Sequence, residues 1–242
     1  MKAALSVPLL VLVVLTSVGN AFDLNKALKD AEEKILNQDK GQDEATKASG
    51  LKEALSIGTH NAVQYVSRTD GYFGNPAIKI PVPDEIKSVA DTLSRVGLRK
   101  QVDEFVLSMN RGAEKAAPKA ASIFLRAIKG MTIADATTIL LGNDTAATGY
   151  FKAKTRSDLY REFKPVIVAS LNEVGATKAF KEMMRRADSI PFLDKEAIDL
   201  DHYVTDKALE GLFYMVGQEE KKIRTDPAAR VTDLLRTVFG GN

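Results

Sequence analysis

The stretch that decides the fold is MTIADATTILLGNDTAATGYFKAKT, residues 131–155. Thr132, with Asp135 three positions later, has the form of a capping box at the start of a helix, with Asp in place of the usual Glu or Gln. Apolar residues then recur at helical spacing, and Gly142 is predicted to end the helix in a left-handed conformation. The Asn-Asp pair that follows can cap a second helix. The sequence therefore predicts two helices joined by a tight corner.

Helical periodicity continues on both sides of this corner, and no paired strand pattern interrupts it. We predict an all-α, compact, multi-helix bundle-like domain. Its centre is a helix that Thr205 caps and that ends near Arg224, because residues 211–217 are apolar on every side. Pro118 and Pro165 fall within helical patterns, and each either kinks or splits its helix.

The amino terminus has the pattern of a secretory signal peptide over residues 1–21. A basic Lys2 precedes an apolar run, and cleavage after Gly19 or Ala21 would leave small residues at the required positions. The alternative is a membrane anchor, but the run falls short of the roughly 20 apolar residues that a span needs. No later stretch is apolar for long enough. We therefore expect an exported soluble protein, periplasmic if the source is a Gram-negative bacterium.

After signal removal, residues 22–242 are expected to form a single helical domain, with 22–47 as a loosely docked leading helix and arm. The charged stretch 37–47 is predicted to be the loop or arm that follows this helix. The chain has no Cys and only two His, so disulfides and thiolate chemistry are excluded, and no metal-ligand spacing is present. No cofactor motif is found either. Lys and Arg number 34 against 32 Asp and Glu, and this near balance argues against nucleic acid as the main partner.

One long irregular segment is predicted over residues 69–83, where three prolines prevent helix formation. Its apolar content indicates that it packs across the helices. Two interpretations remain open: a binding loop that presents Tyr72, Asn75 and Lys79, or a connector clamped by its own apolar side chains.

Two groups of polar residues could carry chemistry. The first lies on a helix otherwise lined by small and apolar residues, and consists of Asn110, Arg111 and Glu114. With Tyr72, Asn75 and Lys79 these residues are candidates for binding a ligand or partner. The second spans the turn between the last two predicted helices, and consists of Glu219, Glu220, Arg224, Asp226 and Arg230. Glu220 and Arg224 have the spacing of a helical ion pair. We interpret the second group as a structural seam that ties the last helix to the central one, in preference to a catalytic site.

Several longer motifs occur in one order along the chain. They are Gly71-Tyr72 with Asn75, IKIPVP from Ile78, MNRGAEKA from Met109, MTIADA from Met131, ILLG with AATGYF, YVTDKALEGLF from Tyr203, and the EE, IRTDPAAR and LLRTVFG series from Glu219. With these motifs the chain resembles the bacterial exported family catalogued as domain of unknown function 4197. The resemblance implies an exported helical domain and no activity.

Two functions from different classes follow from these observations. The first is a non-enzymatic binding protein for an apolar small molecule or an envelope protein. The alternative is a hydrolase of the cell envelope that uses Glu114, Glu219 or Glu220 as acid or base. A carboxylate pair at the floor of an open cleft would favour the hydrolase, and carboxylates engaged by arginine away from a cleft would favour the structural seam.

Overall fold

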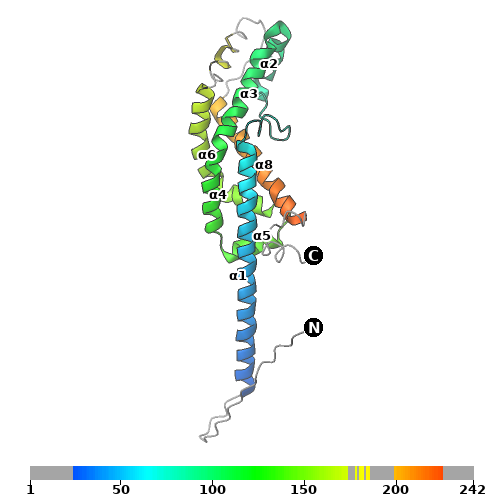
Figure 1. The fold of residues 1–242 in the computed structure, drawn as a ribbon, viewed down its shortest axis with the longest axis vertical. Helices are drawn as coiled ribbons and strands as arrows, with labels where there is room; N and C mark the ends of the chain where they lie inside the picture. The colour runs from blue at the N-terminus through cyan, green and yellow to red at the C-terminus, as the bar shows by residue number, and fades with distance from the viewer. Residues whose placement is uncertain (1–23, 174–177, 179, 183, 186–198, 226–242) are drawn as a thin grey trace. The chain divides into compact units, whose positions relative to one another are not determined.

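The computed structural model of the chain describes residues 24–173, 178, 180–182, 184, 185 and 199–225, with side chains from residue 43 onward. Regular structure within these residues is helical, with no strand, which confirms the all-α prediction (Figure 1). The predicted signal peptide and the predicted final helix after residue 225 lie outside the described residues. The chain divides into two units, residues 1–42 and 43–242.

The leading helix is longer than the sequence indicated. Helix α1 is assigned as Leu24–Ser67, so residues 37–47, predicted as a loop or arm, are helical. Six of these eleven residues are Gln, Lys, Glu or Ala, which are good helix formers, and none is proline. An ion pair of 2.6 Å between Lys47 and Asp43, four residues apart, adds to the helical preference.

An irregular segment follows α1 and leads into the helices α2 (Lys87–Leu93) and α3 (Arg99–Ala116). The predicted loop over 69–83 is confirmed, since these residues form turns and extended backbone. Gly97 separates α2 from α3 with a φ of 91°, a left-handed conformation that glycine adopts without steric cost.

The two prolines that were expected to kink or split a helix lie in different settings. Pro118 lies in a 3-10 turn, Ala117–Lys119, between α3 and α4 (Ala120–Lys129), where its missing N–H costs little. Pro165, by contrast, lies inside α6 (Ala146–Glu173), which remains one helix.

The corner at residues 131–155 forms as predicted in outline. Thr132 and Asp135 make a reciprocal capping box at the start of α5 (Ile133–Leu141), with N···O distances of 3.0 and 3.1 Å. The prediction for Gly142 is wrong: its φ of −79° and ψ of −180° are extended. Space rather than handedness requires glycine there, because a Cβ would lie 2.6 Å from the Ala146 methyl group.

Helix α8 (Leu200–Thr225) is the central element, as predicted, and packs on α6 and α3. It begins earlier than expected: Thr205 is not a cap, and its hydroxyl donates to the Asp201 carbonyl one turn back. The segment 211–217 is buried except for Tyr214, which is 46% exposed, and the half-buried Gly217.

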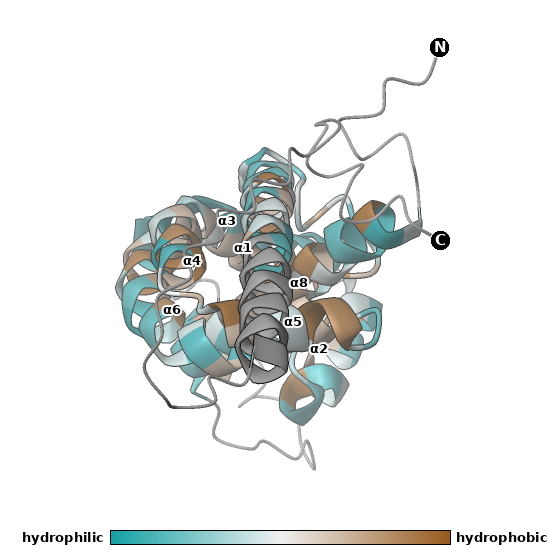
Figure 2. Cartoon of the chain, turned by 90° about the horizontal axis from the view of Figure 1, so that it is seen from below, coloured by the Kyte–Doolittle hydropathy of each residue, from teal (hydrophilic) through white to brown (hydrophobic). Residues whose placement is uncertain are grey.

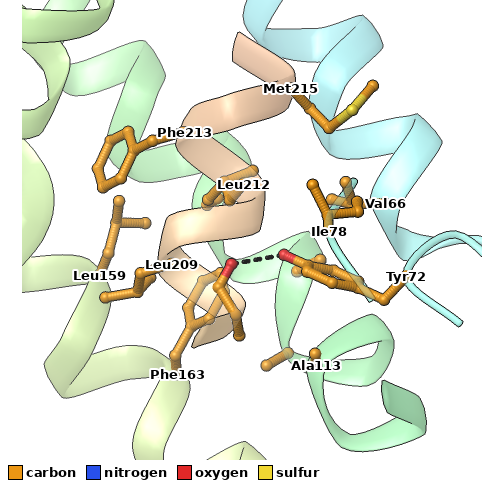
Figure 3. Packing of buried hydrophobic residues seen from close by; sticks show 14 of the residues in the cluster. Val66, Tyr72, Ile78, Ala113, Leu159, Phe163, Leu209, Leu212, Phe213 and Met215 are labelled. Atoms are coloured by element: carbon orange, nitrogen blue, oxygen red, sulfur yellow. Dashed lines mark hydrogen bonds between the residues drawn. The ribbon is translucent and has the colours of Figure 1, made fainter. Parts of the chain in front are cut away.

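The core lies where α3, α4, α6 and α8 converge on the irregular segment. Figure 2 shows hydrophilic residues on the outer sides of α3, α4 and α6 and hydrophobic residues turned inward. Phe124 of α4 makes an edge-on contact with Phe151 of α6, with ring centroids 5.2 Å apart. Figure 3 shows Leu159 and Phe163 of α6 facing Leu209 of α8. Among the described helices, none combines the length and apolar character that a membrane crossing requires.

The core contains one polar atom whose removal should stabilise the fold. The Ser170 hydroxyl on α6 is buried and has no hydrogen-bond partner among the described residues. An unsatisfied buried polar group costs about 1–3 kcal/mol, so Ser170→Ala should raise the free energy of unfolding by about 1 kcal/mol.

Ser108→Ala is the matched control for this substitution. Ser108 is also buried, but its hydroxyl donates to the Phe105 carbonyl at 2.7 Å. Its removal should lower the free energy of unfolding by about 0.5–1.5 kcal/mol in the same urea titration. A loss of stability for Ser170→Ala equal to that of Ser108→Ala would show that the Ser170 hydroxyl is in fact satisfied.

Candidate functional site

Glu114 of α3 holds the start of the irregular segment. Its Oε1 accepts hydrogen bonds from the backbone N–H groups of Tyr72 and Phe73, at 3.1 and 3.2 Å. Its Oε2 receives Arg111 Nη1 at 2.6 Å, and Arg111 Nη2 reaches Asp70 Oδ1 at 2.7 Å. The Glu114 side chain is only 5% exposed, so its charge is paired and hydrogen-bonded where water cannot solvate it.

Tyr72 is inserted between α3 and α8 and is fully buried. Its hydroxyl donates to the Ala208 carbonyl at 2.6 Å, as the dashed line in Figure 3 shows. Burial, with a further contribution from the Glu114 charge, raises the pKa of Tyr72 well above its ordinary value. The ring fits because residue 211 is glycine: a Cβ there would lie 2.6 Å from Tyr72 Cε1.

Asn110, one turn before Glu114, holds the end of the same segment. Its Oδ1 accepts from Ile80 N at 2.8 Å, and its Nδ2 donates to the Ile80 carbonyl at 2.9 Å. Nδ2 also donates to the Val106 carbonyl at 2.8 Å. Asn110 is fully buried, and it pairs with Ile80 as a neighbouring strand would.

The six residues predicted as a binding group therefore gather around one segment, mostly to hold it in place. Asn75 accepts from Ala77 N at 3.1 Å and so shapes its own turn. Lys79 is exposed, with its Nζ 4.0 Å from the centre of the Phe73 ring. The geometry favours the clamped connector, because the polar groups of Tyr72, Asn110 and Glu114 are used within the fold.

Glu220 of α8 occupies the amino-terminal end of α6. Its two carboxylate oxygens accept from Ala147 N at 2.9 Å and Thr148 N at 2.8 Å, and Oε2 also accepts from the Thr148 hydroxyl at 2.7 Å. These N–H groups belong to the first turn of a helix and have no partner within it. A carboxylate here also meets the positive end of the helix dipole.

Arg224 completes this arrangement from the next turn of α8. Its Nε and Nη2 lie 3.2 and 3.1 Å from Glu220 Oε1, which confirms the predicted ion pair. Nη2 also donates to the Ile139 carbonyl at 2.9 Å, in the last turn of α5. Glu220 and Arg224 therefore bind α8 to both helices of the α5–α6 corner.

The other three residues of the predicted seam, Glu219, Asp226 and Arg230, are not part of the Glu220–Arg224 contact as described. Glu219 accepts from Asn61 of α1 at 3.1 Å and from Lys222 at 2.5 Å, on the other side of α8. Asp226 and Arg230 lie outside the described residues. The contact of Glu220 with α6 was not predicted. The sequence does hold a signal for it, since the first turn of α6 contains no acidic residue of its own.

A second polar cluster joins α6 to α8, and it was not predicted from the sequence. Tyr160 Oη lies 2.7 Å from His202 Nδ1, and His202 Nε2 lies 3.2 Å from Asp206 Oδ2. Asp206 Oδ1 accepts from Arg156 Nη2 at 3.0 Å. Each helix contributes residues four apart, which is the only sequence signal. In the part of the chain that is described, no group of three or more His, Asp or Glu could hold a metal ion.

An open groove of about 230 Å³ lies between α1 and α4. Its walls combine small, apolar and hydroxyl side chains: Ser56, Thr59, His60, Ala121, Ser122, Leu125 and Ile128. Leu125 is 43% exposed there, and neither Glu114 nor Glu220 lines the groove. Glu220 instead borders a space of about 10 Å³, roughly the volume that one water molecule needs.

The carboxylates in this arrangement are not placed for general acid–base catalysis. A catalytic carboxylate must reach a substrate atom within hydrogen-bonding distance. The carboxylate oxygens of Glu114 and Glu220 accept from backbone N–H groups and arginines, and those of Glu219 accept from Asn61 and Lys222. None of these three residues lines the groove. Carboxylates engaged by arginine away from a cleft were expected for a structural seam, so the geometry favours a structural role over the hydrolase.

Removal of the Glu220 charge tests this assignment. Glu220→Gln keeps the shape of the side chain but removes the buried negative charge that accepts from the first turn of α6 and from Arg224, and we expect a loss of about 3 kcal/mol in the free energy of unfolding. Glu219→Gln is the matched control, and its more exposed contacts should cost less than about 1 kcal/mol. Thermal melts that show Glu220→Gln unchanged or stabilised would indicate a functional carboxylate, because active sites commonly sacrifice stability.

Comparison with known proteins gives a family and no activity. The family model described as "Protein of unknown function (DUF4197)" matches residues 41–240. No curated protein and no solved structure matches the chain. The match covers most of the sequence and includes both carboxylate sites and the groove. The chain therefore belongs to the DUF4197 family of proteins of unknown function.

Proposed function

We propose that this protein is a non-enzymatic, exported binding protein whose partner is another protein of the cell envelope. The observations that carry the proposal are the use of Glu114 and Glu220 within the fold and an open groove between α1 and α4 that neither of them lines. The alternative carboxylate-dependent hydrolase has no comparable support, because none of its three candidate residues, Glu114, Glu219 and Glu220, lines that groove.

A protein segment suits the groove better than an apolar small molecule. Pockets for small molecules usually measure about 300–1,000 Å³ and bury most of the ligand. The α1–α4 groove is smaller, at about 230 Å³, and it is open. A groove of this kind accommodates one anchoring side chain of a partner helix, with contacts around it that exclude water.

Export is part of the proposal and rests on residues 1–21. Lys2, the apolar run and the small residues before position 22 favour removal of this segment during secretion. The mature chain would begin at Asn20 or Phe22 and would work in the periplasm if the source is Gram-negative. Two envelope proteins can then meet through the groove without a cofactor.

Photo-crosslinking in cells tests the proposal directly. A benzophenone amino acid replaces Leu125 in the groove, or Val96 in the matched control, which is 62% exposed but outside it. We expect a discrete protein adduct from position 125 alone, on a chain whose amino terminus is Asn20 or Phe22. Ser122→Trp should fill the groove and abolish the adduct.

Three results would contradict the proposal. They are equal adducts from both positions, an adduct that survives Ser122→Trp, and saturable uptake of a fluorescent fatty acid by the delipidated protein without any protein adduct. The last result would return the apolar small molecule as the ligand. An uncleaved chain retained inside the cell would contradict the export part alone.

A further inference from the structure

The α4 wall of the groove has an unbalanced charge. Residues 117–129 contain Lys119, Arg126 and Lys129 and no Asp or Glu. All three cations are exposed, and none has an ion-pair partner among the described side chains. Several other exposed lysines, such as Lys47 and Lys87, form an ion pair with a carboxylate one helical turn away. The helix dipole favours the two cations in the last turn of α4 but does not neutralise them.

The α1 wall does not compensate this charge. Its lining residues Ser56, Thr59 and His60 carry no carboxylate. The half-buried Lys52 and Glu53 precede them and cancel each other in formal charge. The groove therefore combines apolar and hydroxyl side chains on its walls, and the cations of residues 117–129 give it a positive rim.

From this juxtaposition we propose that the partner segment is an acidic amphipathic helix. This inference rests on the proposed function and names the chemistry of its partner. One apolar side chain of the partner enters between Leu125 and Ile128, and carboxylates on either side of it face Lys119 and Arg126. Complementary charge at the rim mainly sets partner choice and the association rate, while the apolar anchor supplies affinity.

A lipid surface fits the groove less well. Interfacial helices insert a broad apolar face with several large side chains into the headgroup region. The groove is concave, and Leu125 is the one large apolar side chain exposed on its described walls. Anionic vesicles therefore serve as the competing probe in the experiment.

The experiment selects helical peptides from a phage-displayed library. Each peptide carries leucine at one fixed position, and the flanking positions vary among Glu, Asp, Lys, Arg, Ser and Gln. Selection on the full chain, with counter-selection against the Ser122→Trp variant, should enrich peptides of net negative charge. The Lys119→Glu/Arg126→Glu variant should bind the enriched peptides at least about tenfold more weakly.

Arg95→Glu/Lys152→Glu is the matched control, because it changes the net charge equally at exposed positions outside the groove. It should bind the enriched peptides as the unmodified chain does, and circular dichroism should show both variants folded. Neutral or basic enriched peptides, equal loss in the control, or stronger binding to phosphatidylglycerol vesicles would overturn the acidic partner. A groove-dependent crosslink that persists alongside such a result would leave the proposed function intact.

Discussion

A buried carboxylate that accepts backbone N–H groups from a distant segment is the interaction on which this fold depends. The irregular stretch after α1 belongs to no helix or sheet that would pair its backbone groups, and its buried N–H groups need acceptors. Glu114 supplies one to Tyr72 and Phe73, and Asn110 pairs with Ile80. These contacts from a single helix fix the Tyr72 ring against Gly211 and so position α8, the centre of the core.

The same device operates at the α5–α6 corner. Glu220 satisfies the first turn of α6, and Arg224 balances its charge and bonds to the end of α5. In both places the charge is paired where burial alone would make it costly. This use of the carboxylates explains why the most chemically suggestive residues give no active site, and it directs the search for function to the surface between α1 and α4.

The sequence predicted features that depend on neighbouring residues. The Thr132–Asp135 capping box, the irregular segment and the Glu220–Arg224 pair are each set within one helical turn or one loop. Errors arose where the environment decides the outcome. Gly142 is constrained by the Ala146 methyl group rather than by handedness, and the charged stretch after residue 36 continues α1.

Long-range partners could not be predicted. Glu220 is 73 residues from Ala147, and Glu114 is 42 residues from Tyr72, so neither contact leaves a periodic pattern. The groove likewise needs two helices whose lining residues lie far apart along the chain. Periodicity identifies which face of a helix is buried, but it does not identify the helix that covers that face.

A double-mutant cycle between Glu114→Gln and Gly211→Ala tests the central claim most directly, with the free energy of unfolding measured in urea. If Glu114 serves to hold Tyr72 against α8, Glu114→Gln should cost about 3 kcal/mol. Gly211→Ala should also destabilise, because its Cβ would overlap the Tyr72 ring. The double variant should lose at least about 0.5 kcal/mol less than the sum, since both changes release the same segment. Additive losses, or a Glu114→Gln variant as stable as the unmodified chain, would contradict the account.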